Sequence, residues 1–153
     1  MEELRVAVEN DSTQYIVIKI GEEQYGINIA FVDNIVRMQH ITRVPKVASY
    51  LKGVINLRGI VVPVMSLRLK MGLPVDEVTK ATRIIILKHE TAGTIGIIVD
   101  EVKEVITLDS EQIEKVVSSE TTPDHVNFVQ SVGKCGEELV SILDLNAVTI
   151  EKE

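Results

Sequence analysis

The sequence has few of the cysteines and histidines from which common metal and disulfide sites are built. It has one cysteine, three histidines and no tryptophan among 153 residues. Cys135 cannot close an internal disulfide, and it stands in a glycine-flanked turn without a nearby histidine, so we interpret it as a strand-end thiol. The histidines, His40, His89 and His125, lie tens of residues apart without a companion cysteine pair. We therefore predict neither a metal site nor a cofactor.

Catalytic motifs are also missing. There is no Gly-x-Ser-x-Gly elbow, no complete phosphate-binding loop and no His-Glu-x-x-His motif. Gly133-Lys134-Cys135 lacks the final hydroxyl of a phosphate loop, and Phe128 stands where the leading glycine belongs. The acidic pairs Asp100-Glu101 and Glu22-Glu23 are adjacent along the chain, which is typical of solubilising charges. We predict no catalytic residues and no enzyme activity.

Long hydrophobic runs are absent. The longest, Ile84 to Leu87 and Ile97 to Val99, fall far short of the ~20 residues that a membrane-spanning helix needs. The acidic N-terminus also lacks the basic start of a signal peptide. With 45% apolar and 25% charged residues, the chain is able to bury one core or two small adjoining ones. We expect a soluble cytoplasmic protein without direct membrane insertion.

Acidic residues are absent from residues 34–75, although Asp and Glu make up 23 of the 153 residues and the net charge is -7. The bases in this window are Arg37, Arg43, Lys46, Lys52, Arg58, Arg68 and Lys70. The window is either a docking face for an acidic partner or a solvated surface that is basic by chance. Because single-stranded nucleic acids stack on aromatic side chains, and the chain has only three tyrosines and two phenylalanines, an RNA-binding barrel is a minor alternative.

Short strands rich in Ile and Val dominate the predicted secondary structure. Residues 1–13 are polar and acidic, and we expect a flexible tail there. One hairpin is predicted at 15–20 and 24–29, and a second strand pair at 53–57 and 60–65, broken at Arg58-Gly59. Short helical turns are predicted at 30–36 and 47–51. The best candidate for a longer helix, 109–117, is too isolated for an open α/β sheet.

The second half of the chain repeats the first. Gly26, Ile27, Ile29, Val32, Ile35 and Val36 recur 70 residues later as Gly96, Ile97, Val99, Val102, Val105 and Ile106. Val61, Val62, Val64, Met65 and Leu67 recur 78 residues later as Leu139, Val140, Ile142, Leu143 and Leu145. The polar stretch 118–124 is predicted to be a loop that accounts for the difference between the 70-residue and 78-residue offsets. A sheet of about five short strands buries little unless it curls into a barrel or packs on its twin.

The predicted fold is therefore all-β with a few short helices, formed by two tandem five-stranded β-barrels that pack side by side along an apolar seam. We place the first barrel at residues 14–82 and the second at 83–153.

A family resemblance appears in the acid-free window. Gly53 to Gly59 (GVINLRG), followed by Ile60 to Val64 (IVVPV) and Leu67-Arg68, closely resembles the signature of the CheW family. Further matches are Glu23-x-Tyr25-Gly26-Ile27, Ile41-Thr42-x-Val44-Pro45, Gly96-Ile97-x-Val99-Asp100 and Val140-x-Ile142-Leu143-Asp144-Leu145. The resemblance runs from Gln14 to about Val148, essentially the whole chain.

The resemblance implies SH3-like barrels and a non-catalytic role in chemotaxis, a two-component signalling system. CheW-like proteins are adaptors that bind the cytoplasmic tips of methyl-accepting chemotaxis receptors and the regulatory domain of the histidine kinase CheA. We accordingly expect recruitment to membrane-associated receptor arrays. The same domain occurs in CheA and CheV, so an isolated regulatory-type domain of that kind is the alternative.

The resemblance further implies a receptor-facing groove between the barrels. The receptor-binding residues carried over are Val32, Ile35, Gly53, Asn56, Arg58, Val61, Val102 and Val105. For Val32 and Val102, buried core is an equally good interpretation. For Arg58 we favour a partner carboxylate over an internal salt bridge.

Some positions carry a second interpretation or depart from the family. Gly53, Asn56 and Gly59 have an alternative role in shaping the turn. Asn34 replaces a common glutamate, which removes a charge from the expected contact surface. Ser66 replaces a common aspartate, but it is still able to cap a short helix, as is Asp144 at the equivalent place in the second repeat.

Overall fold

The structure is a computed structural model that describes residues 12–75, 77–89, 93–115 and 128–149. The predicted tail lies outside these residues apart from Ser12 and Thr13, and Thr13 already begins the first strand. The predicted loop 118–124 and His125 also lie outside them.

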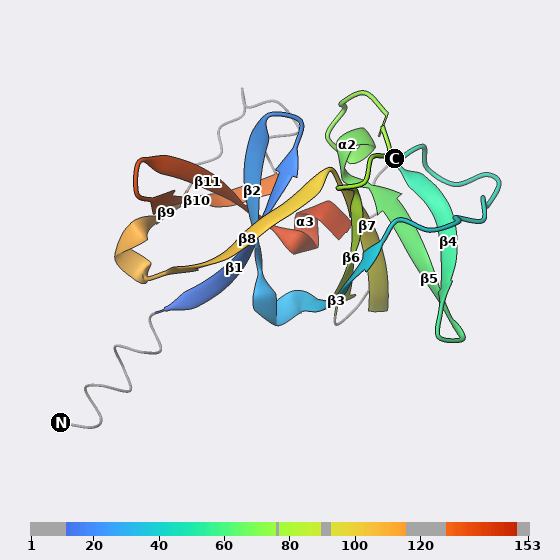
Figure 1. Ribbon diagram of the computed structural model, residues 1–153, viewed down its shortest axis with the longest axis horizontal. Coiled ribbons are helices and arrows are strands. Elements are labelled where there is room, and N and C mark those ends of the chain that lie inside the picture. The colour runs from blue at the N-terminus through green and yellow to red at the C-terminus, as the bar shows by residue number, and fades with distance from the viewer. Residues whose placement is uncertain (1–11, 76, 90–92, 116–127, 150–153) are drawn as a thin grey trace.

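Strands make up most of the described chain (Figure 1). In chain order they are β1 (Thr13–Ile20), β2 (Glu23–Asn28), β3 (Val32–Arg37), β4 (Leu51–Leu57), β5 (Ile60–Ser66), β6 (Arg83–His89), β7 (Gly93–Val99), β8 (Glu101–Leu108), β9 (Ile113–Lys115), β10 (Val129–Cys135) and β11 (Glu138–Leu143). The helices are short: η1 (Ile29–Phe31), α2 (Leu67–Lys70), η2 (Ser110–Gln112) and α3 (Leu145–Thr149). The all-β fold class and both predicted hairpins are confirmed.

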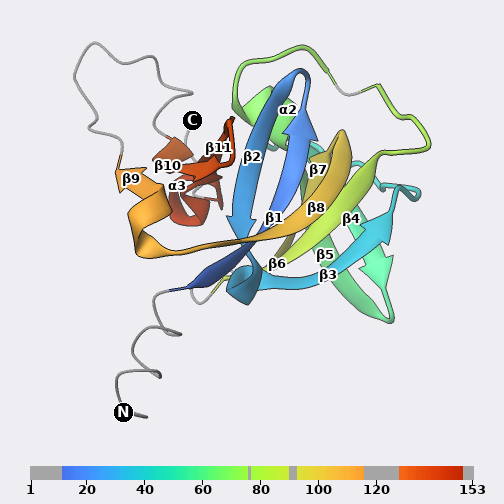
Figure 2. The same cartoon turned by 60° about the vertical axis from the view of Figure 1, so that its left-hand side comes forward.

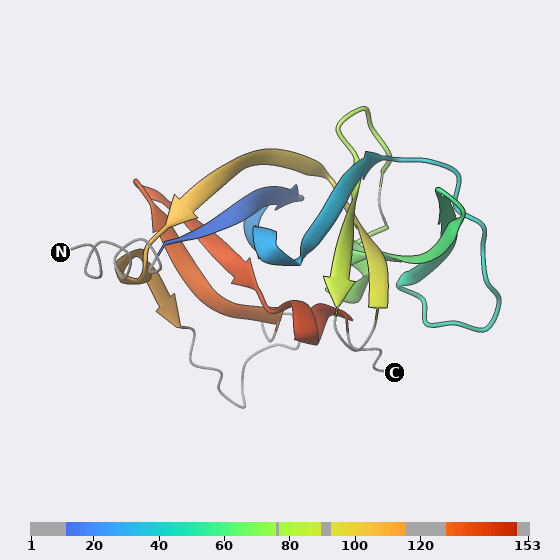
Figure 3. The same cartoon turned by 90° about the horizontal axis from the view of Figure 1, so that it is seen from below.

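Two sheets with the same strand order form the molecule. Sheet A has six strands in the order β8-β1-β2-β11-β10-β9, and sheet B has five in the order β3-β6-β7-β5-β4. Apart from β9, each strand of sheet A has a repeat equivalent at the same place in the order of sheet B. The equivalent strands are β8 and β3, β1 and β6, β2 and β7, β11 and β5, and β10 and β4. In both sheets the central contact is parallel, between β11 and β2 in one and between β5 and β7 in the other, while the remaining pairs are antiparallel. Figure 3 shows the two sheets curling side by side.

The two halves of the chain exchange hairpins. The β1–β2 hairpin of the first half pairs with β8 and β11 of the second, and the β6–β7 hairpin of the second half pairs with β3 and β5 of the first. The sheets therefore do not coincide with the predicted ranges 14–82 and 83–153. Each sheet is completed only by strands from both ranges.

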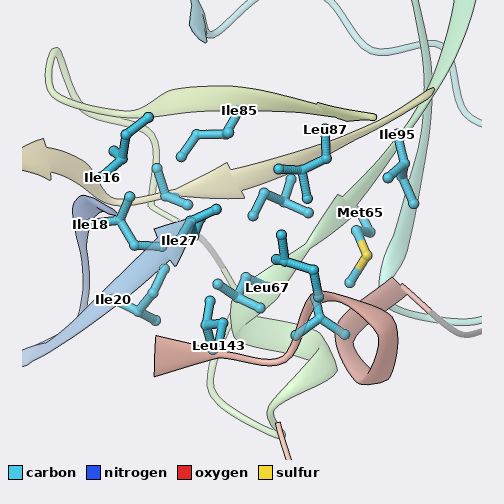
Figure 4. Close-up of a cluster of buried hydrophobic side chains, with 14 of the residues drawn as sticks. Ile16, Ile18, Ile20, Ile27, Met65, Leu67, Ile85, Leu87, Ile95 and Leu143 are labelled. Carbon is cyan, nitrogen blue, oxygen red and sulfur yellow. The ribbon is translucent and has the colours of Figure 1, made fainter. Parts of the chain in front are cut away.

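Three apolar cores hold this arrangement together. Each sheet encloses a small core, with Val62 and Val64 in sheet B at the positions that Val140 and Ile142 occupy in sheet A. The third and largest core fills the seam between the sheets (Figure 4), and it includes Ile16, Ile18, Ile20, Ile27, Met65, Leu67, Ile85, Leu87, Ile97 and Leu143. Each fully buried aliphatic side chain of this kind contributes about 1.5–3 kcal/mol. The predicted seam is confirmed.

Of the two predicted helical turns, the first is confirmed only at Ala30 and Phe31, and the second is wrong. Only Ile29–Phe31 is helical near 30–36, and Val32 to Arg37 form β3, because alternate residues pack inward and the strand finds a partner in β6. Residues 47–50 contain a bend and a turn but no helix, and β4 begins at Leu51. Within the described part of 109–117, a single 3-10 turn precedes β9.

The predicted caps are confirmed. The Ser66 hydroxyl accepts a hydrogen bond from the Leu69 amide at 3.1 Å at the start of α2. The Asp144 carboxylate accepts one from the Ala147 amide at 3.4 Å at the start of α3. Serine thus replaces the family's common aspartate without loss of the cap.

Candidate functional site

The structure brings the eight predicted contact residues into two groups. Val32 and Ile35 lie on β3, and Val102 and Val105 lie on β8, the equivalent strand of the other sheet. The other four, Gly53, Asn56, Arg58 and Val61, belong to the β4–β5 hairpin. The residues predicted to line one groove therefore lie on an end strand of each sheet, β3 and β8, and on the β4–β5 hairpin at the other end of the strand order of sheet B.

The β3 and β8 residues flank the seam. Val32 and Val102 are half-buried and both pack against the seam core, so their predicted core role is confirmed in part. Ile35 and Val105, three residues further along each strand, are 37% and 51% exposed. Each strand therefore runs from the seam core to an apolar side chain at the surface, and the repeat produces this feature twice.

The tip of the β4–β5 hairpin is a two-residue turn with both central residues in the left-handed region. Arg58 has φ 54° and Gly59 has φ 85°, between the paired residues Leu57 and Ile60. The Asn56 side-chain oxygen accepts a hydrogen bond from the Gly59 amide at 2.9 Å and thereby fixes the turn. The predicted turn-shaping role of Asn56 is confirmed.

This turn displays Arg58 to solvent. The side chain is exposed, and among the described residues it forms no ion pair, so the structure gives no support to an internal salt bridge. Ile60 and Val61 beside it are 63% and 64% exposed. A guanidinium therefore stands next to two of the most exposed large apolar side chains of the described chain.

Gly53 serves the backbone. Its φ is 143°, and a Cβ atom placed on it would lie 2.0 Å from the Thr42 carbonyl oxygen. Thr42 and Val54 form a short bridge there, with amide-to-carbonyl hydrogen bonds of 2.8 Å in both directions. Gly53 thus lets the segment that precedes β4 cross the strand closely. Gly53 is buried, so it offers no exposed surface for its predicted contact with a partner.

Some exposed apolar residues were not among the predicted contacts. Leu139 on β11 is 63% exposed and stands at the position that Val61 occupies on β5. The internal repeat contained this signal, because it pairs Val61 with Leu139. Ile29 and Phe31 in η1 are 37% and 45% exposed, and the sequence prediction gave this segment no contact role.

Asp100 holds two turns together, which corrects its interpretation as an ordinary solubilising charge. Its carboxylate accepts hydrogen bonds from Arg68 Nε at 2.9 Å, from Arg68 Nη2 at 2.6 Å and from the Gly21 amide at 2.7 Å. The hydrogen bonds from Arg68 lower the pKa of Asp100, partial burial opposes the shift, and the bond from Gly21 adds to the lowering. Arg68 is thus an internal partner and is unsuited to docking.

The other bases of the acid-free window have different surroundings. The Lys70 ammonium lies 3.9 Å from the centre of the Tyr50 ring, a cation–π contact. Arg37, Arg43 and Lys46 are exposed. The Asn34 side-chain oxygen accepts a hydrogen bond from the Ile35 amide at 2.9 Å. The residue that replaces the common glutamate therefore bonds to the backbone of its own strand.

The described residues contain no group of three or more His, Cys, Asp or Glu that could hold a metal ion. No helix within the described ranges has the length and apolar character to cross a membrane. The candidate site presents exposed apolar side chains on β3, β5 and β8, with the Arg58 guanidinium at the β4–β5 turn.

Comparison with known proteins identifies relatives along nearly the whole chain. The CheW-like domain matches residues 14–153. The chain is 41% identical over 138 residues to the chemotaxis protein CheW of Bacillus subtilis (strain 168), covering 90% of this chain and 86% of that protein. It is 37% identical over 135 residues to the chemotaxis protein CheW of Helicobacter pylori (strain ATCC 700392 / 26695), covering 88% and 80%. The crystal structure of the scaffolding protein TtCheW from Thermoanaerobacter tengcongensis is similar with a TM-score of 0.78 at 32% identity, covering 86% and 88%.

Proposed function

This chain belongs to the CheW-like domain family, and from that premise we propose that it is a non-catalytic chemotaxis adaptor that couples methyl-accepting receptors to the histidine kinase CheA. The observation that carries the proposal is the tip of the β4–β5 hairpin, where exposed Arg58 stands beside exposed Ile60 and Val61. Exposed apolar side chains next to a cation are typical of the anchor of a protein interface.

The receptor is proposed to dock through apolar contacts whose register is set by charge. A helical hairpin presents apolar side chains at regular spacing, and these would contact the exposed Ile35 on β3 and Val105 on β8. The two strands are repeat equivalents, so both sheets are able to contact one partner. Arg58 supplies a planar cation for a carboxylate on that partner.

The kinase is proposed to bind at the same time through a separate surface. Two moderate contacts on one small protein raise the effective concentration of each partner near the other. Recruitment to receptor arrays at the membrane follows from this double contact, because the chain needs no anchor of its own when its partners are already there.

A regulatory-type domain of the CheA or CheV kind is the alternative, since it shares the fold. The adaptor is expected to bind the regulatory domain of CheA directly, without another CheW-like protein present. An RNA-binding barrel is a weaker alternative, because the described chain displays few aromatic side chains for base stacking.

The test is titration calorimetry of the full chain with a soluble receptor cytoplasmic fragment and, separately, with the CheA regulatory domain. Binding to both at micromolar concentrations is expected. Arg58→Glu should weaken receptor binding by at least about ten-fold while leaving the melting temperature nearly unchanged. Arg58→Asn keeps a residue that tolerates the left-handed turn, so it separates the loss of charge from the loss of turn geometry.

Arg43→Glu is the matched control, because it makes the same change of charge on an exposed residue of the segment between β3 and β4. It should leave receptor binding within about two-fold of the original value. If neither partner binds, the proposal is wrong. If Arg58→Glu unfolds the protein, Arg58 has a structural role instead.

A further inference from the structure

Two arginines face each other at the end of the ladder between β3 and β6. Arg37 is the last residue of β3, Arg83 is the first of β6, and the two are register partners in the antiparallel pair. Directly opposed residues project to the same side of a sheet, and like charges in such a pair are destabilising. Among the described residues neither arginine forms an ion pair. An anion bound between them would remove this repulsion.

The same two arginines line a cavity of about 460 Å³. Lys80 adds a third cation, and Met38 and Val78 add apolar surface. None of the described residues that line the cavity is acidic. Figure 2 shows the end of β3 beside the start of β6 and the connection that leads into β6.

Arg83 is held in position by the turn that precedes it. Its Nη1 atom donates to the Lys80 carbonyl at 2.8 Å and to the Thr82 carbonyl at 2.9 Å. The turn is itself closed by the Thr79 amide, which donates to the Thr82 hydroxyl at 2.8 Å, and by the Ala81 amide, which donates to the Thr79 hydroxyl at 3.1 Å. A guanidinium that is already oriented loses less conformational entropy when it binds a ligand.

We propose that this cavity, the β3–β6 pocket, binds a small organic molecule through a phosphate group. A phosphate monoester carries a charge of about -1.5 to -2 at neutral pH, which suits a cavity lined by three cationic side chains better than a single carboxylate does. Arginine forks bind phosphate oxygens in pairs. The volume lies in the usual range of small-molecule sites, and Met38 and Val78 would contact the apolar part of the ligand.

The pocket is distinct from the candidate partner site, and the proposal does not depend on the adaptor role. The two regions meet only in β3, which carries Val32 and Ile35 as well as Arg37. A phosphate between Arg37 and Arg83 would hold the end of β3 against β6.

The experiment is an amide chemical-shift titration of the full chain with inorganic phosphate, with sodium chloride at matched ionic strength as the reference and succinate as a dicarboxylate. Saturable shifts are expected at the amides of Thr79, Lys80 and Ala81 with phosphate and not with chloride. Arg37→Gln should weaken phosphate binding by at least about ten-fold. Lys134→Gln, which removes one positive charge from sheet A, should keep it within about two-fold.

A melting experiment gives an independent readout. In chloride alone Arg37→Gln should melt no lower than the original protein, because the variant removes the repulsion. Phosphate should raise the melting temperature of the original protein and leave that of Arg37→Gln unchanged. Shifts that chloride reproduces, or phosphate binding that survives Arg37→Gln, would overturn the proposal. Tighter binding of succinate than of phosphate would overturn the assignment to phosphate.

Discussion

At the scale of single residues, the contact between Arg68 and Asp100 joins parts of the chain that are remote in sequence. Arg68 lies in α2, Asp100 lies between β7 and β8, and the third partner, Gly21, lies in the turn between β1 and β2. The side chains of Arg68 and Asp100 are only 20% and 24% exposed, so solvent screens this pair less than a surface pair. Sequence reasoning placed both among surface charges because nothing in their spacing shows that the two turns meet.

The first prediction concerns Asp100 and pH. Because the pKa of Asp100 is lowered in the folded state, its contribution to the free energy of unfolding is present above the ordinary carboxyl pKa and is lost as the pH falls through the lowered value. Asp100→Asn should lower the free energy of unfolding by about 1–3 kcal/mol at neutral pH and flatten its decline in acid. Urea unfolding followed by circular dichroism at several pH values measures both effects.

Asp33→Asn is the control for this prediction. Asp33 lies 3.9 Å from Lys88, and both side chains are more than half exposed. Its loss should change the free energy of unfolding at neutral pH by less than about 0.5 kcal/mol. An equal acid decline for Asp100→Asn and the original protein would show that Asp100 is not the group that titrates.

The second prediction concerns Gly53. Gly53→Ala should lower the free energy of unfolding by at least about 2 kcal/mol, because the added methyl would meet the Thr42 carbonyl and φ lies where side chains are strained. Gly59→Ala also has a positive φ, but no atom lies within 4 Å of its added carbon. Its cost should be smaller, about 1–2 kcal/mol. Thermal unfolding distinguishes the two, and an equal loss would mean that the Thr42 contact relaxes easily.

At the scale of elements, the sequence predicted strands well where apolar residues are frequent on both sides of a clear turn. The hairpins at 15–29 and 53–65 have such turns at Gly21 and at Arg58-Gly59, and both are present. β3 was missed because Val32, Ile35 and Val36 have helical spacing as well. Its strand state is decided by pairing with β6, some 50 residues away, which no local pattern contains.

The third prediction compares the outer faces of two equivalent hairpins. Val61 on β5 and Leu139 on β11 are 64% and 63% exposed. Val61→Ser and Leu139→Ser should therefore change the melting temperature little. If the β4–β5 hairpin is the receptor contact, Val61→Ser alone should weaken binding of a receptor fragment, measured by calorimetry. Equal weakening by both variants would argue that the repeat, rather than the one hairpin, makes the contact.

At the scale of the whole molecule, the repeat predicted two similar units and an apolar seam between them. It did not predict which strands share a sheet. A repeat shows that two segments adopt the same conformation. It does not show whether a sheet is completed by strands of the same half of the chain or by the equivalent strands of the other half. The exchange of hairpins is therefore visible only in the pairing of β1 with β8 and of β3 with β6.

The fourth prediction follows from this exchange. Fragments 1–82 and 83–153 should each fail to fold alone, because each lacks a hairpin that its own strands require: the first lacks β6–β7 and the second lacks β1–β2. Mixed together, they should recover the far-ultraviolet circular dichroism of the full chain. The full chain should unfold in one transition, with spectroscopic and calorimetric curves coinciding. Cooperative unfolding of either fragment by itself would contradict the expectation.

The hairpin exchange also determines how the two ends of the molecule are connected. The hairpin β4–β5 and the hairpin β10–β11 stand at opposite ends of the molecule (Figure 1). Each of these hairpins is bonded to a strand from the other half of the chain, β5 to β7 and β11 to β2, so neither end is able to detach with its own half alone. A pull on either end would therefore be carried by strands from both halves of the chain.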